Sequence, residues 1–236
     1  MSSNLKREAH IYLRALKEEG IDHLYLPTKR INPFSLDQKK TNPSLDQQNA
    51  KDALLALRQS VLACTKCDEL ARTRNSVVFG AGNIKAQLMF VGEAPGQEED
   101  LQGLPFVGRA GQLLTKIIES IGLDRKQVFI ANVLKCRPPQ NRQPHPEEIL
   151  NCQGYLVRQI ELIQPKIICC LGAFASQTLL KTEESITHLR GKFFAYHSAK
   201  IICTYHPAYL LRNPSEKRKV WEDMKLIKKE LDSFKS

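Results

Sequence analysis

Four cysteines stand in two pairs whose spacing is typical of metal ligands. Cys64 and Cys67 form a C-x2-C pair, and Cys136 and Cys152 form a second pair with fifteen residues between them. Four thiolates can hold a [4Fe–4S] cluster or a tetrahedral zinc ion, and the spacing alone does not choose between these. A redox C-x-x-C motif normally opens a helix after a strand, whereas this one follows a predicted helix and precedes the first predicted strand.

The other three cysteines are better explained as core residues. Cys169, Cys170 and Cys203 lie among isoleucines in predicted strands, where a thiol packs like a small apolar side chain. Cys67 and Cys136 instead stand beside charged residues, which are poor surroundings for core packing. The sequence therefore predicts that the two pairs bind a metal or a cluster.

A second group of polar residues comes directly after predicted strands. The turn 92–96 (GEAPG) follows the first strand, Asn132 closes the second, Gly172 follows the third, and His206 follows the fourth. Parallel sheets bind ligands in the crevice beyond the carboxyl ends of their strands. We therefore expect these residues to meet at one site.

The elements that position these residues alternate along the chain. Apolar runs predict four buried strands at Gln87–Val91, Gln127–Val133, Lys166–Leu171 and Lys200–Tyr205. Helical patterns occur at Ala53–Ala63 and at 110–121, 146–163, 172–181 and 215–233. This order predicts an α/β fold, a three-layer α/β/α arrangement with a central, mostly parallel four-stranded sheet.

Five motifs together resemble the family 4 uracil-DNA glycosylases, the iron–sulfur members of their superfamily. The resemblance runs from about Cys64 to Lys229, and its motifs are the cysteine pairs, GEAPGQEED (92–100), LPFVGRAG (104–111), ANVLKCRPPQNR (131–142) and HPAYLLRNP (206–214). It implies a [4Fe–4S] cluster on the four paired cysteines. It also implies that the chain hydrolyses the N-glycosidic bond of deoxyuridine in DNA, releases uracil and leaves an abasic site for base excision repair. No lysine is placed as a Schiff-base nucleophile, so water is expected to attack.

The pocket residues suit this chemistry. Phe106 offers an aromatic face to a flipped base, and the amide of Asn132 matches N3–H and O4 of uracil but not the edge of cytosine. A hydrogen bond from His206 to O2 would strengthen as negative charge develops on the departing base. The resemblance implies that Gly92, Glu93 and Ala94 also line the uracil site. Glu93 either positions water or blocks a thymine methyl group, and Glu98 is predicted at the pocket rim.

The segment after His206 is predicted to face DNA. It is similar to the loop that enters the minor groove in this superfamily, where Leu210 or Leu211 would fill the gap left by the flipped base. Arg137, Arg142 and Arg212 are predicted phosphate contacts, with Lys217 and Arg218 as further candidates. Either leucine could instead anchor the following helix.

Charge and composition set the wider expectations. The net charge of +10 over 236 residues favours a polyanionic partner, here single- or double-stranded DNA containing uracil. Residues 1–50 are predicted to form an amphipathic helix (5–19) and a polar linker, and residues 51–236 the catalytic domain. No apolar run reaches the roughly 20 residues of a membrane span. A cytosolic monomer associated with the nucleoid is therefore expected.

Three alternatives stay open at this point. The chain could be a nucleic-acid-binding member of the superfamily that kept the fold and cluster but lost the reaction. It could also belong to the branch that forms a covalent adduct with uracil-DNA through a histidine in an inserted loop, although no such insertion is present and His145 lies in a different setting. The third is a zinc-stabilised hydrolase with an unrelated substrate.

Overall fold

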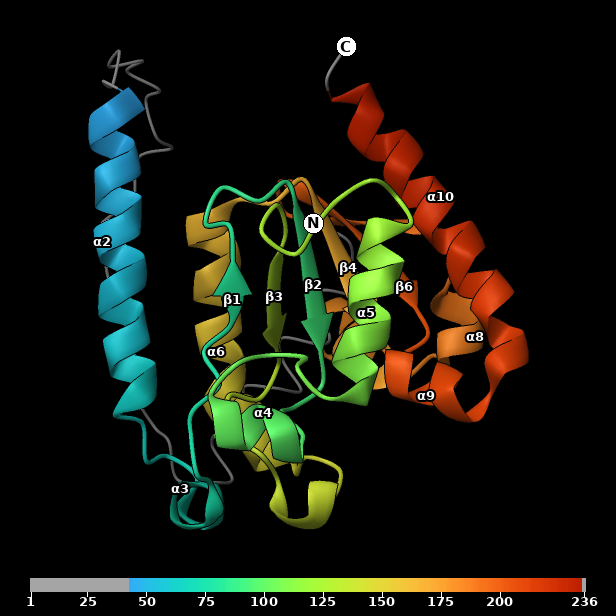
Figure 1. The fold of residues 1–236 in the computed structure, drawn as a ribbon. Coiled ribbons are helices and arrows are strands. Elements are labelled where there is room, and N and C mark those ends of the chain that lie inside the picture. The colour runs from blue at the N-terminus through green and yellow to red at the C-terminus, as the bar shows by residue number, and fades with distance from the viewer. Residues whose placement is uncertain (1–42, 235–236) are drawn as a thin grey trace, which may run out of the picture. The chain divides into compact units, whose positions relative to one another are not determined.

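The computed structural model describes residues 43–234, so the helix predicted over 5–19 lies outside the described residues (Figure 1). The first described helix, α2 (Pro43–Leu62), begins ten residues before the predicted start at Ala53. Residues 43–50 are therefore helical, where the composition predicted linker. A proline is tolerated in the first turn of a helix, and polar residues suit the outward side of a helix that packs against a neighbour, here α6.

The sheet has six strands in the order β1-β3-β2-β4-β6-β5. Its four central strands pair in parallel, as the sequence predicts. These strands are β3 (Phe129–Asn132), β2 (Leu88–Gly92), β4 (Ile167–Leu171) and β6 (Ala199–Thr204). Two antiparallel edge strands were not predicted, β1 (Ala81–Gly82) and β5 (Phe193–Tyr196). β1 has only two residues and β5 is only partly buried, so neither carries a strong apolar pattern.

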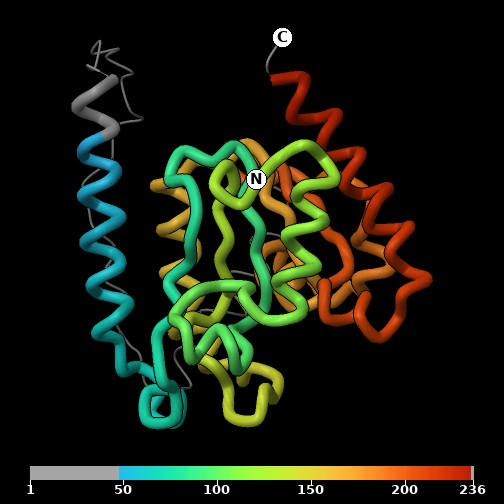
Figure 2. The backbone as a smooth tube through the Cα atoms, viewed as in Figure 1, coloured from blue at the N-terminus to red at the C-terminus, as the bar shows by residue number. Residues whose placement is uncertain are grey.

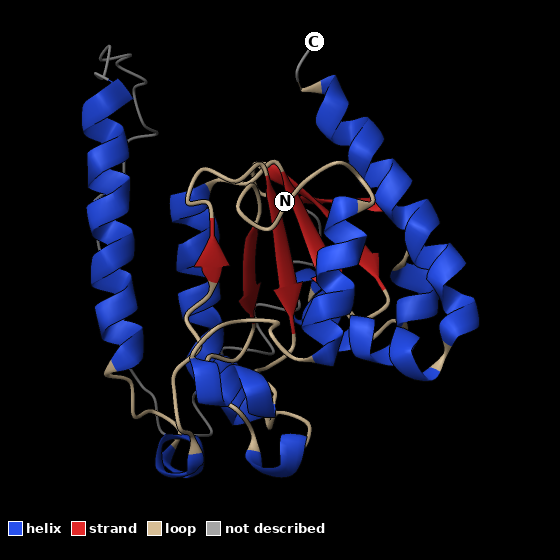
Figure 3. Cartoon of the chain, in the orientation of Figure 1, coloured by secondary structure: helices blue, strands red, loops and turns tan. Residues whose placement is uncertain are grey.

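Helices cover both faces of the sheet, which confirms the predicted three layers (Figures 1 and 3). Because side chains alternate along a strand, each central strand contributes to two separate cores. On β4, for example, Ile168 and Cys170 pack on one face, whereas Ile167 and Cys169 pack on the other. One core is closed by α2, α6 (Pro146–Ile163), α7 (Ala173–Leu180) and α8 (Ile186–Leu189). The other is closed by α5 (Arg109–Glu119), α9 (Pro207–Arg212) and α10 (Lys217–Ser233).

The remaining short elements gather where the parallel strands end. Figure 2 allows the chain to be followed from β2 through α4 and back to α5 along this edge. The short elements are α3 (Asp68–Thr73), α4 (Gln97–Gln102) and the 3-10 turns Pro139–Asn141 and Pro214–Glu216. Cys169, Cys170 and Cys203 are fully buried in the sheet, as predicted. Among residues 43–234, no helix is long and apolar enough to cross a bilayer.

Candidate active site

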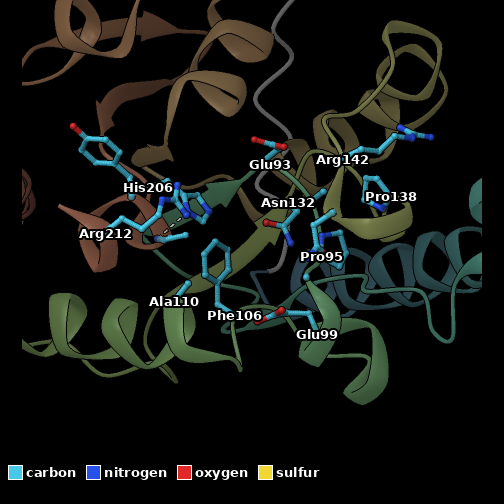
Figure 4. A pocket seen from close by; sticks show the side chains of 15 residues that line it. Glu93, Pro95, Glu99, Phe106, Ala110, Asn132, Pro138, Arg142, His206 and Arg212 are labelled. Atoms are coloured by element: carbon cyan, nitrogen blue, oxygen red, sulfur yellow. Dashed lines mark hydrogen bonds between the residues drawn. The ribbon is translucent and has the colours of Figure 1, made fainter. Parts of the chain in front are cut away.

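A cavity of about 450 Å³ opens at the carboxyl ends of the parallel strands (Figure 4). Its volume lies within the range of small-molecule sites. The turn after β2, the loop before α5, the end of β3 and the start of α9 contribute its walls. Seven of the predicted site residues line it together, namely Glu93, Ala94, Phe106, Asn132, Arg142, His206 and Arg212.

Gly92 lets two of these side chains meet. A Cβ atom at this position would overlap the Asn132 amide oxygen and would lie 2.6 Å from Cζ of Phe106, so only glycine leaves room for both. The Asn132 side chain is 1% exposed, and its Oδ1 has no hydrogen-bond partner. An unpaired buried acceptor costs about 1–3 kcal/mol. A ligand that donates a hydrogen bond to Oδ1 would remove this cost.

Phe106 adopts a backbone conformation that phenylalanine rarely takes. Its φ of 53° lies in the left-handed region, and such strain is typical of functional sites. The ring is 6% exposed, and its centroid lies 5.6 Å from that of His206 at a tilt of 35°. Gly111 permits this loop, because a Cβ there would overlap the Phe106 carbonyl. Phe106 therefore presents a fixed aromatic wall to the cavity.

His206 is held as a neutral hydrogen-bond donor. The backbone N–H of Ala208 donates to its Nδ1 at 3.1 Å, and the histidine thereby caps α9. Burial, together with the positive charge of Arg212, lowers the pKa of His206 to about 4. The ring is therefore uncharged near neutral pH, and because Nδ1 accepts a hydrogen bond, Nε2 carries the proton.

Two glutamates line the cavity, and one of them was not predicted. Burial raises the pKa of the Glu93 carboxyl. Glu99 accepts hydrogen bonds from the backbone N–H groups of Val107 and Gly108, both at 2.9 Å, and so fixes the loop that carries Phe106. Glu98 is exposed and is not among the residues that line the cavity, so its place at the rim stays a prediction. In the run Glu98-Glu99-Asp100, only the orientation of α4 decides which carboxylate points inward.

The two leucines predicted as candidates for the wedge differ in burial. Leu210 is 1% exposed and belongs to the core between the sheet, α5 and α10, so it anchors α9 and cannot reach DNA. Leu211 is 38% exposed and is the remaining wedge candidate.

The predicted phosphate contacts also differ from one another. Arg142 forms ion pairs with Glu69 and Glu148, both at 2.6 Å, and extends away from Phe106 and His206 in Figure 4. Its charge is neutralised within the protein, which argues against the predicted phosphate contact. Arg137 donates to the Asn141 side chain at 2.8 Å, whereas Arg212 is exposed beside His206.

The four paired cysteines line a second, smaller cavity. Three sulfurs have N–H groups within reach: Arg74 donates to Cys136 at 3.1 Å, the Lys135 backbone to Cys152 at 3.2 Å, and Asn151 to Cys67 at 3.6 Å. Burial raises the pKa of Cys152 to about 11, so a thiolate there needs a cation beside it.

The four cysteines lie at one site and suit both metal sites that the sequence left open, a tetrahedral zinc ion and a larger iron–sulfur cluster.

Comparisons with known proteins agree with this geometry. Residues 79–225 match the uracil DNA glycosylase superfamily. The chain is 47% identical over 177 residues to a type-4 uracil-DNA glycosylase of Archaeoglobus fulgidus, an alignment that covers 72% of this chain and 88% of that protein. It is also 47% identical to the type-4 uracil-DNA glycosylases of Saccharolobus solfataricus, over 77% of this chain and 88% of the relative, and of Thermotoga maritima, over 72% and 90%.

Proposed function

Because the chain belongs to the uracil DNA glycosylase superfamily, we propose that it is a hydrolase that releases uracil from DNA and leaves an abasic site. The observation that carries this proposal is the convergence of Phe106, Asn132 and the neutral His206 on one cavity. A binding protein without activity would have no need for an unpaired amide oxygen beside a strained aromatic wall.

The pocket accounts for the choice of base. A uracil that leaves the DNA stack enters the cavity and packs on Phe106. The unpaired Oδ1 of Asn132 accepts from N3–H, and its Nδ2 donates to O4. Cytosine carries an acceptor and a donor in the reverse positions, so its binding would leave both amide groups unpaired in a buried site. Each unpaired group costs about 1–3 kcal/mol, which disfavours cytosine strongly.

The reaction places negative charge on uracil and positive charge on the sugar. His206 donates from Nε2 to O2, and a neutral donor with this fixed orientation stabilises the departing base as its charge develops. The Glu93 carboxylate orients a water molecule toward the sugar carbon, and its raised pKa makes it a better base than an ordinary glutamate. Water replaces the base, uracil leaves, and the phosphodiester backbone stays intact.

We further propose that the four cysteines hold a [4Fe–4S] cluster, which supplies a structural crosslink between α3, the loop after β3 and α6. The shared cavity of the four cysteines and the N–H donors at their sulfurs support this assignment. Visible absorption near 400 nm, with iron and sulfide analysis, tests it. Stoichiometric zinc without iron would contradict it. The monomeric state and the cytosolic location stay predictions.

One experiment tests the activity directly. The purified full-length chain is incubated with labelled oligonucleotides that contain uracil, thymine, cytosine or hypoxanthine, as single and double strands, and alkali then reveals abasic sites. We expect alkali-sensitive cleavage with uracil and none with thymine or cytosine. The absence of product from every uracil substrate would overturn the proposal. A protein–DNA band that survives SDS would instead identify the adduct-forming branch.

A further inference from the structure

A lysine is buried between the uracil cavity and the cysteines. Lys135 follows β3 and is 1% exposed, and its ammonium group donates to the Asn132 backbone carbonyl and to Oε1 of Gln159, both at 2.7 Å. Gln159 is itself fully buried and donates to the Phe79 carbonyl at 2.8 Å. The side chain of Lys135 thus reaches the residue that reads the base.

The backbone of the same residue contacts the cysteine site. Its N–H donates to Sγ of Cys152 at 3.2 Å, and its carbonyl accepts from the Val78 N–H at 2.8 Å. Lys135 also immediately precedes Cys136, another of the four cysteines. One residue therefore touches both functional regions, with its backbone on one side and its ammonium group on the other.

Among the described residues, the ammonium group of Lys135 has no ion pair with a carboxylate. Both of its acceptors are uncharged oxygens, and a buried ammonium group without an anion nearby is costly. A cation at this depth therefore depends on its hydrogen bonds to the Asn132 carbonyl and to Gln159.

The contact with Asn132 lies where β3 ends, and the next two N–H groups, of Val133 and Leu134, donate to the Gly92 and Glu93 carbonyls. Gly92 pairs with Asn132 at the last position of the β2–β3 ladder, and the chain then turns through Val133 and Leu134 toward the cysteines. The ammonium group supplies the hydrogen bond of the Asn132 carbonyl at this turn. That carbonyl belongs to the peptide plane that follows Asn132, so the contact holds the backbone from which the Asn132 side chain projects.

We propose that Lys135 is a positioning residue through which the four-cysteine site orients Asn132, so that the metal site controls uracil binding through this lysine. This inference rests on the proposed function. It explains why a charged side chain occupies a position at which an apolar residue would fill the core at lower cost.

The test compares two affinities of the iron-loaded full-length chain. Lys135→Met preserves length and burial but removes the donor. We expect its affinity for free uracil to fall about 10- to 100-fold, as for the loss of a hydrogen bond from a charged donor, while its affinity for DNA with an abasic site stays unchanged. General damage to the fold would lower both affinities. Lys200→Met is the matched control, since Lys200 pairs with Glu230 on the surface and contacts neither region.

A double-mutant cycle decides whether Lys135 acts through Asn132. If it does, Lys135→Met combined with Asn132→Ala binds uracil no more weakly than Asn132→Ala alone. Losses that multiply, with the iron content intact, would overturn the inference. If Lys135→Met does not retain iron, the same cycle uses Gln159→Met, which frees the ammonium group and leaves the cysteines in place, and the same criterion applies. Failure of the wild-type chain to release uracil would be a separate result, against the proposed function.

Discussion

The uracil cavity and the cysteine site differ in whether their polar side chains have hydrogen-bond partners within the protein. In the uracil cavity, Oδ1 of Asn132 is buried without a partner, and His206 is kept uncharged. At the cysteine site, N–H donors reach three of the four sulfurs, those of Cys67, Cys136 and Cys152. The uracil cavity therefore keeps an acceptor available for a ligand, whereas most sulfurs of the cysteine site already accept hydrogen bonds from the protein.

This difference is expected between a site that binds and releases its ligand, the uracil cavity, and a site that retains its ligand, the cysteine site. A pocket that must admit and release uracil benefits from groups whose partners arrive with the substrate. A permanent cluster needs thiolates that are already oriented and compensated. The ion pairs of Arg142 with Glu69 and Glu148 belong to the second pattern, because they join α3 to the start of α6 beside the cysteines.

The largest effect is expected from the removal of one of the four proposed cluster ligands. Cys136→Ala deletes one thiolate and leaves the Arg74 guanidinium without its acceptor. Because binding of a structural metal contributes directly to folding, we expect loss of iron and a destabilisation of about 3–5 kcal/mol, or about 10 °C in Tm. Absorption spectroscopy, iron analysis and thermal unfolding measure this. The control is Cys169→Ala, which lies in the core of the sheet and should keep its iron. A Cys136→Ala protein that is colourless but stable and fully active would contradict a structural role for the cluster.

The next effect belongs to the uracil cavity alone. His206→Ala removes the donor that faces the departing base, and such a loss typically lowers kcat by about 10²–10³-fold. Single-turnover kinetics on uracil-DNA measure the change, and iron content should stay at the wild-type value. His188→Ala, at an exposed position, is the control. If His206→Ala loses iron as well, the two regions are less separate than the contacts indicate.

A smaller effect tests the DNA-facing side of the cavity. Leu211→Ala removes the exposed wedge and should lower activity on double strands about 10-fold with little change on single strands, because only a duplex leaves a gap to fill. Leu210→Ala should instead destabilise the fold by about 2–5 kcal/mol, as a buried leucine does. Activity on both substrates and thermal unfolding distinguish the variants. Equal losses on single and double strands for Leu211→Ala would argue against a wedge.

The sequence predicted the centre of the fold because the four parallel strands are continuous apolar runs. It missed β1 and β5, whose pairing depends on neighbouring strands and not on their own pattern. The start of α2 was misplaced because Asn, Gln, Asp and Lys occur both in linkers and on the exposed side of helices. The edge strands and the start of α2 depend on packing against other elements, and local composition does not indicate such packing.

The site was predicted in part for similar reasons. Asn132 and His206 could be identified because the end of a buried strand has a known place in a parallel sheet. The choice of Glu99 over Glu98, and of Leu211 over Leu210, depends on how the short helices α4 and α9 are rotated. A helix of six residues has too few apolar positions to indicate its inner face. Lys135 was missed because a lysine beside a cysteine gives no sequence signal of burial.

The smallest expected effect lies in the pH profile, and it sharpens the assignment of roles within the cavity. The pKa of His206 is lowered to about 4, so this ring stays neutral from mildly acidic pH upward and cannot cause a change in rate near pH 5–6. Burial raises the pKa of Glu93 above its ordinary value, so its carboxylate is lost at a higher pH than that of an exposed glutamate. We therefore expect kcat/KM to decline on the acidic side because Glu93 becomes protonated, by at most tenfold per pH unit. The decline should persist in His206→Gln and disappear in Glu93→Gln, each measured against its own maximum rate. If the decline disappears in His206→Gln and persists in Glu93→Gln, the histidine ionises in this range and the glutamate does not. That result would contradict the assignment of His206 as a neutral hydrogen-bond donor.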